Sequence, residues 1–335
     1  MAQAGSQATP AFALYGEDGG ALARLAASRD VTTGVSVFWK RRAGSYYWVT
    51  SEVPTRLGAV QEQWVTADPK LQVQSAVALG DTGFLNYEQT WRTYQPGSHR
   101  TVDWFKVVNN PRIDSSQSAW FEQGFQSWNN QATLTLAARP FADGDPTHTE
   151  FADYRDTYSM KLTRDGTEIG QGSYWYSFFR IPSGNAKYEA VLEASRSLPG
   201  WGFATRSTTT WSFAAGGSTA AHAPISMPQV TYDVDAGLDN RVKPRVPQTM
   251  TVNARPWLAG GADVVDVKVW ASYDDGRTWT ALTLTPTGTA GTYGAAFTTP
   301  TVADSSGYVS LRATATDANG HRVEQTVERA FGIER

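Results

Sequence analysis

Short runs in which apolar and polar residues alternate, each ended by Gly, Asp, Asn or Pro, recur along the whole chain. Successive side chains of a β-strand point to opposite faces, so this period of two predicts strands with one buried and one solvated face. In the first two thirds of the chain the pattern is clearest at residues 34–40, 71–77, 132–136, 157–163, 187–194 and 206–213. We therefore expect an all-β protein.

Two segments are also compatible with a short helix. Residues 21–28 follow a Gly-Gly pair and are rich in Ala and Leu, and residues 115–127 are the second candidate. The first of them is equally compatible with a loop. Helix is therefore expected to contribute little to the fold.

The last third of the chain carries strand-like runs at a spacing of about 8–12 residues, which is typical of a β-sandwich. These runs are residues 230–234, 249–254, 264–273, 278–283, 293–298, 308–317 and 322–331. A stretch of small residues at 214–224 has little to bury and is interpreted as a linker, and a weaker boundary lies near residues 80–83. We expect a small β module over 1–80, a β-sandwich over 81–222 and an immunoglobulin-like or fibronectin type III-like sandwich over 223–335.

The composition excludes several classes of partner. Lys and Arg number 29 against 32 Asp and Glu, a net charge of −3, so no basic surface for nucleic acid or anionic membrane is expected. The absence of cysteine rules out disulfides and thiolate chemistry. No run of about 20 apolar residues is present to span a membrane. The low charged fraction of 18% is typical of an extracellular β protein, and we expect secretion directed by a signal peptide outside this chain.

One motif stands out in the last third of the chain. Ser272, Asp274, Gly276, Thr278 and Trp279 fit the Asp-box pattern S-x-D-x-G-x-T-W. In such a turn the Asp accepts backbone N–H groups, Gly supplies a positive φ and Trp packs beneath the hairpin. A sialidase-type propeller would repeat the box in every blade, whereas here it occurs once. We interpret the motif as a structural hairpin with a buried Trp279, rather than as part of an active site.

A cluster of acidic residues precedes the second run of the last third. Asp233, Asp235 and Asp239 place three carboxylates within seven positions, and oxygen-rich clusters of this kind hold calcium. The loop departs from an EF-hand because no Glu closes it; Lys243 and Pro244 follow instead. A calcium site and a solvated Asp-rich turn are the two interpretations.

The chain has thirteen tryptophans, several times the usual share, and they fall into two groups. Trp39, Trp64, Trp211 and Trp270 occupy alternating positions of strand-like runs and are expected in the core. The runs 46–48 and 174–179 contain consecutive aromatic residues, which cannot all face one side of a strand. Some of these side chains must be exposed or meet a neighbouring domain.

From these two runs we expect a contact surface formed by Trp48, Tyr174, Trp175 and Tyr176. An interdomain contact is the first interpretation. A platform for polysaccharide, on which exposed aromatic rings stack against sugars, is the second.

No complete catalytic constellation is visible in the sequence. The four histidines, His99, His148, His222 and His321, lie in polar or turn-like segments, and neither a G-x-S-x-G elbow nor an H-E-x-x-H motif occurs. Carboxylate chemistry of the glycosidase kind stays open in an acidic chain, but no pair of residues stands out.

Several motifs resemble the C-terminal region of large secreted subtilisin-like serine proteases of actinobacteria. They are residues 272–279, 307–313, 315–320 and 323–330, and more loosely residues 156–170, 186–196 and 205–213. The resemblance covers roughly residues 81–335. The family's catalytic motifs D-x-G, H-G-T and G-T-S-M-A are absent, so no catalytic residue is carried over.

The resemblance implies a non-catalytic accessory region that stabilises the protease or positions its substrate. Its partner would then be its own protease domain or a protein substrate. The alternative is a free-standing extracellular adhesion or carbohydrate-binding module. A third reading is an enzyme that works through carboxylates.

Overall fold

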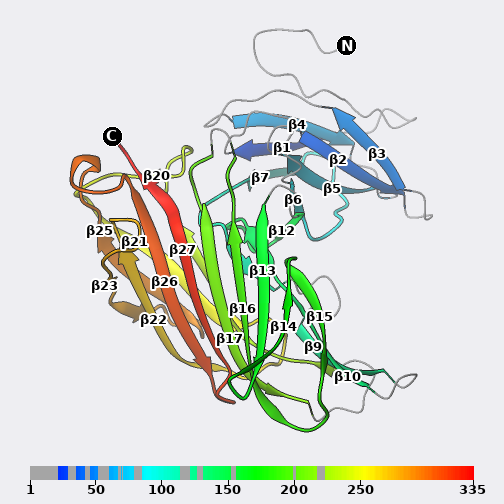
Figure 1. Cartoon of the computed structure of the whole chain (residues 1–335). Helices are drawn as coiled ribbons and strands as arrows, with labels where there is room; N and C mark the ends of the chain where they lie inside the picture. The colour runs from blue at the N-terminus through cyan, green and yellow to red at the C-terminus, as the bar shows by residue number, and fades with distance from the viewer. Residues whose placement is uncertain are drawn as a thin grey trace. The chain divides into compact units, whose positions relative to one another are not determined.

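The computed structural model describes residues 22–28, 35–41, 46–51, 60–66, 69, 71–78, 85–113, 121–126, 131–151, 156–198, 201–216 and 223–335. Most of these residues form strands, numbered β1 to β27, and a short 3₁₀ helix lies at Val302–Asp304 (Figure 1). The expected all-β class is confirmed. Within this described part, no helix is long and apolar enough to cross a membrane.

The chain forms two compact units, which are described separately. The first comprises residues 1–106, 145–153 and 236–240, and the second comprises residues 107–144, 154–235 and 241–335. These units do not follow the expected boundaries at residues 80 and 222. The three-module organisation therefore stays a prediction about which parts fold independently.

The first unit contains two sheets. The three-stranded sheet has the order β4-β1-β7 and the five-stranded sheet the order β12-β6-β5-β2-β3. Their bounds are β1 Leu22–Ser28, β2 Val35–Arg41, β3 Tyr46–Ser51, β4 Val60–Thr66, β5 Leu71–Ala78, β6 Leu85–Glu88, β7 His99–Asp103 and β12 His148–Phe151. The strands expected at 34–40 and 71–77 are confirmed. The helix considered for 21–28 is wrong: β1 has a hydrogen-bonded strand on each side, and this pairing outweighs a weak helix preference.

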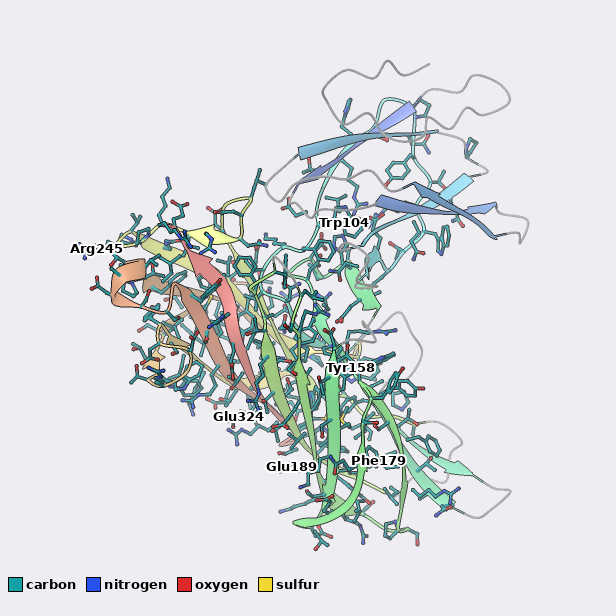
Figure 2. The ribbon with its side chains drawn as sticks, turned by 45° about the horizontal axis from the view of Figure 1, so that its top comes forward. Trp104, Tyr158, Phe179, Glu189, Arg245 and Glu324 are labelled. Atoms are coloured by element: carbon teal, nitrogen blue, oxygen red, sulfur yellow. The ribbon has the colours of Figure 1, made fainter. Side chains whose placement is uncertain are left out.

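The second unit is built around one wide sheet with the order β14-β13-β16-β17-β27-β26-β22-β23, shown in Figure 1. A short strand, β20, pairs with β27 in parallel. The bounds are β13 Thr157–Arg164, β14 Thr167–Gly172, β16 Ala186–Ser195, β17 Arg206–Ala215, β20 Arg241–Val242, β22 Val264–Ser272, β23 Thr280–Ala281, β26 Tyr308–Asp317 and β27 Arg322–Ile333. One face is apolar and buried, whereas Glu189 and Glu324 lie on the outer face (Figure 2).

A four-stranded sheet covers one half of this wide sheet. It has the order β19-β21-β25-β24, with bounds β19 Pro228–Val234, β21 Pro247–Pro256, β24 Leu284–Pro286 and β25 Thr292–Thr298. In chain order these strands take the places of A, B, D and E of an immunoglobulin constant-type sandwich, while β22, β26 and β27 take those of C, F and G. The rings of Phe297 and Phe331 meet between the layers with centroids 5.7 Å apart. The expected immunoglobulin-like sandwich is confirmed by this strand order.

A second four-stranded sheet packs on the other half and makes a second sandwich. Its order is β15-β10-β9-β18, with bounds β9 Phe121–Gln126, β10 Gln131–Ala137, β15 Tyr176–Ile181 and β18 Ala223–Pro224. Phe121 contacts Trp211 and Phe213 of the wide sheet, with ring centroids 5.1 and 6.0 Å apart. Trp211 is therefore a core residue, as expected. The helix considered for 115–127 is wrong over 121–126, which form β9; residues 114–120 lie outside the described part.

The two sandwiches share a single sheet because β17 pairs with β27. Their register runs from Arg206 opposite Glu328 to Ser212 opposite Arg322. Ala214 and Ala215 end β17, and Ala223 and Pro224 form β18, so both ends of the expected linker are strands. Residues 217–222 lie outside the described part.

A buried polar network lies at this shared pair of strands. Gln325 of β27 is 2% exposed and donates its amide to the Pro111 carbonyl at 3.0 Å and to the Thr209 hydroxyl of β17 at 3.4 Å. Asn110, in the short strand β8 (Asn110–Arg112) that pairs with β11 (Arg139–Ala142), donates to Gln325 Oε1 at 3.0 Å and to the Val230 carbonyl at 2.9 Å. The network ties β8, β17, β19 and β27 together.

Replacing Gln325 with Leu is expected to lower the free energy of unfolding by about 2–3 kcal/mol, because the Asn110 amide and the Pro111 carbonyl each lose one buried partner. Urea unfolding of the full chain measures the loss. Thr326→Leu, on the same strand but the outer face, is the control and should change stability little. An equal effect of both substitutions would contradict the role of the network.

Candidate functional site

Among the residues of the second unit whose exposure the structure describes, the most exposed aromatic side chains gather where the chain passes from β14 to β15. Tyr174 is 53%, Tyr176 48% and Phe178 52% exposed, and Trp175 between them is half-buried. We call Tyr174, Trp175, Tyr176 and Phe178 the aromatic strip. The strip begins in the three-residue turn before β15 and continues along the outward face of β15.

Strand geometry explains why the strip is exposed. Along β15 the exposed residues Tyr176, Phe178 and Arg180 alternate with buried residues, among them Phe179, whose place on the strand is marked in Figure 2. Phe179 packs against Gly170 of β14, where a Cβ atom would lie 2.7 Å from the ring. The absence of a side chain at Gly170 lets the two strands approach, and the buried half of β15 holds the exposed half in place.

A cation–π contact fixes the turn at the start of the strip. The guanidinium carbon of Arg139 lies 4.1 Å from the centroid of the Trp175 ring, and the Ala138 N–H donates to the Trp175 carbonyl at 3.2 Å. Arg139 is buried, so this contact is shielded from water. The strip is thus attached to a rigid support before any partner binds.

The rings of the strip do not form a flat platform. The Tyr174 and Tyr176 centroids are 5.3 Å apart, those of Trp175 and Tyr176 are 4.9 Å apart, and both pairs are inclined by 68°. These are edge-to-face arrangements, which present ring edges as well as ring faces to solvent. The strip therefore offers an uneven apolar surface with two phenol hydroxyls.

The structure brings together three of the four residues expected to form a contact surface: Tyr174, Trp175 and Tyr176. Trp48 lies on β3 in the other unit, and its side chain is outside the described part. Phe178 was missed, although the period of two that places Tyr176 outward also places Phe178 outward.

The Asp-box residues form the expected local hairpin after β22. Asp274 accepts hydrogen bonds from the Thr278 N–H at 2.9 Å and the Thr278 hydroxyl at 2.7 Å, and the Ser272 hydroxyl donates to it at 2.7 Å. The Gly276 N–H donates to the Ser272 hydroxyl at 2.9 Å, and Gly276 has a φ of +83°. The hydrogen bond from the Thr278 hydroxyl contributes most to lowering the pKa of Asp274 to about 2, and the bonds from the Thr278 N–H and the Ser272 hydroxyl add to it. The carboxylate therefore stabilises the turn.

Trp279 and Trp270 are not core residues, contrary to expectation. Both are half-buried and enclose the guanidinium of Arg312, whose carbon lies 4.9 Å from the Trp270 centroid and 4.8 Å from the Trp279 centroid. For Trp270, alternation alone does not say which face of a sheet is covered. For Trp279, the expectation came from the Asp-box pattern, and the ring lies against Arg312 while staying half-buried. Truncating Trp279 therefore removes one exposed cation–π contact, worth about 0.5–1 kcal/mol, and not a core side chain.

The acidic residues proposed for calcium are exposed side chains of β19 and the segment after it. Among the described residues, no group of three or more His, Asp or Glu side chains is placed to hold a metal ion. The structure therefore does not gather Asp233, Asp235 and Asp239 into a site. Calcium binding there stays a prediction.

Two of the described histidines, His148 and His321, make contacts that hold the fold together, and a third, His99, is exposed. His148 is fully buried and stacks on Trp104 with centroids 4.1 Å apart, which leaves its ring no surface for a substrate, while His99 is exposed on β7. His321 Nδ1 lies 2.8 Å from the Ser226 carbonyl and 3.5 Å from the buried carboxylate of Asp317. Because its partner is a carbonyl oxygen, this contact joins the β26–β27 turn to the residues before β19. His222 lies outside the described part.

Comparisons with known proteins identify no family. No family model matches the chain, and no curated protein matches it. Among solved structures, the N-terminal four Ig domains of Dscam1 isoform 1.9 align over 94% of this chain and 73% of that chain at 10% identity, with a TM-score of 0.15. A score this low carries no argument, and the immunoglobulin-like assignment therefore depends on the strand order given above.

The Asp-box turn predicts a pH dependence of stability. Because the pKa of Asp274 is lowered from 3.8 to about 2 on folding, its contribution is complete above about pH 4 and is lost as the pH falls toward 2. Asp274→Asn should therefore melt at a lower temperature than wild type at pH 7, and the gap should close toward pH 2. Asp263→Asn, at another exposed aspartate, is the control. A gap independent of pH would contradict the assignment.

Proposed function

We propose that the chain is a non-catalytic accessory region of a secreted subtilisin-like serine protease, and that the aromatic strip is the surface with which it meets the protease or its polypeptide substrate. One observation carries the proposal. Tyr174, Tyr176 and Phe178 stand side by side, each about half exposed, on a rigidly supported strand.

The composition of the strip suits a protein partner. Soluble domains rarely leave several large aromatic side chains together in water, and such patches mark interaction sites. Tyr, Trp, Phe and Arg are the residues enriched at the centres of protein interfaces, and the strip has Arg139 behind Trp175 and Arg180 at its end.

The non-catalytic part of the proposal is supported by what the polar residues do. Asp274 holds a turn, Gln325 holds the shared strands together, and His148 is enclosed by packing. An immunoglobulin-like sandwich is also a common scaffold for binding rather than for catalysis. Each of these polar groups is engaged in a contact that holds the fold.

The protease part of the proposal, and secretion with it, rests on the resemblance of the sequence motifs. Two of those motifs fall on the hairpin after β22 and on the turn between β26 and β27. The DNA upstream of the first codon tests this part directly. A continuous reading frame with subtilisin motifs is expected, whereas a stop codon followed by a signal peptide would contradict it.

A free-standing adhesion or carbohydrate-binding module is the second candidate. The exposed rings of Tyr174 and Tyr176 favour it, because such rings can stack on sugars. The 68° inclination of neighbouring rings argues for a protein partner instead, since a flat polysaccharide surface is best met by coplanar rings.

Binding of the full chain to immobilised unfolded casein, compared with insoluble cellulose and chitin, tests the contact surface. We expect casein binding to weaken about tenfold or more in Tyr174→Ser/Tyr176→Ser, since interface aromatics carry much of the binding energy. Val246→Ser/Val265→Ser removes two other exposed apolar side chains and should bind like wild type. Loss of cellulose or chitin binding in the tyrosine variant would favour the second candidate, and unchanged binding to all three would contradict both.

A further inference from the structure

We propose that β15 is an open sheet edge that binds an extended polypeptide by adding it as a fifth strand to the sheet β15-β10-β9-β18. The inference rests on the proposed role of the aromatic strip and specifies how that strip binds. The polypeptide would be bound by backbone hydrogen bonds along β15, and the aromatic strip would supply side-chain contacts to it.

The first argument is the pairing of β15. It pairs with β10 along its whole length, from Ala132 opposite Ile181 to Ala137 opposite Tyr176. In the part of the chain that the structure describes, no strand is hydrogen-bonded to its other side. An edge strand of this kind presents a row of N–H and C=O groups that can pair with another chain.

The second argument is that the edge strands β14, β18, β19, β23 and β24 are each short, interrupted or start or end at Pro, whereas β15 is a regular six-residue strand whose one charge is Arg180. Proteins protect edges with short strands, Pro, charges and bulges. β18 and β23 have two residues each, β24 has three and ends in Pro286, and β19 starts at Pro228. β14 carries the exposed Glu168 and a register shift in its pairing with β13.

By contrast, β15 has six residues, Tyr-Ser-Phe-Phe-Arg-Ile, with no proline, carboxylate or register shift. Its buried residues, Ser177, Phe179 and Ile181, pack inside the sandwich and hold the strand extended. A strand that is already in the bound conformation loses little entropy when a partner pairs with it. Selection against self-association would be expected to remove such an edge unless it binds something.

The exposed residues of β15 define the chemistry of the partner. Tyr176 and Phe178 lie on the outward face at alternate positions, so they favour apolar side chains at every second position of an added strand. Arg180 is exposed on the same face, and among the described residues no carboxylate pairs with it. The partner is therefore an extended peptide with alternating apolar residues and an acidic residue opposite Arg180.

The test uses the full chain and a fluorescent octapeptide of alternating Val and Thr with one Asp, acetylated and amidated at its ends. Fluorescence anisotropy measures binding. We expect saturable binding that weakens about tenfold or more in Phe178→Lys, because a charged edge residue opposes strand addition. N-methylation of alternate amides of the peptide should weaken binding similarly, since it removes backbone donors. Val265→Lys, at an exposed apolar residue elsewhere, should bind like wild type.

A second variant tests the inference independently, in case Phe178→Lys does not fold. Arg180→Glu should weaken binding of the Asp peptide and strengthen binding of the same peptide with Lys in place of Asp. Equal binding of the N-methylated and unmethylated peptides would overturn strand addition while leaving the aromatic strip as a contact surface. Wild-type binding in all variants, or binding of cellohexaose but not of the peptide, would also overturn the inference.

Discussion

The pairing of β17 with β27 is the interaction on which the rest of the second unit depends. It turns two sandwiches into one structure with a common sheet, so that the immunoglobulin-like sandwich is extended beyond its own last strand. Gln325 and Asn110 satisfy one another and two backbone carbonyls inside this junction, where an unpaired amide would be costly. Phe121 then packs on Trp211 of β17, which links the sheet containing β15 to the same pair of strands.

Several polar side chains among the described residues of the second unit are engaged in structural contacts. Asp274 closes a turn, Arg312 is enclosed by two tryptophans, and Asp156 is buried with Arg196 at 2.6 Å. The aromatic strip is different, because Tyr174, Tyr176 and Phe178 are each about half exposed. The proposed binding role rests on this exposed strip, which the buried half of β15 holds in place.

The alternation of residues predicted about half of the strands, including most of the long ones of the second unit, because burial of one face imposes a period of two on the sequence. It could not say which strands pair, so the junction at Gln325 was not foreseen: residues 110, 209 and 325 are brought together only by the fold. Nor could it say which face is covered, which is why Trp270 was misplaced; Trp279 was misplaced because the Asp-box pattern does not fix how deeply its Trp is buried. Consecutive aromatics did predict exposure at 174–176, but that β15 is an edge depends on the sheet order.

Hydrogen exchange of the full chain in increasing denaturant, followed by mass spectrometry, tests the common sheet most directly. If β17 and β27 form one cooperative element, their amides should exchange with the same free energy, close to that of global unfolding. Protection of β27 that persists after β17 has exchanged would contradict this account. The immunoglobulin-like sandwich would then be an independent domain, and β15 would lack the continuous support described here.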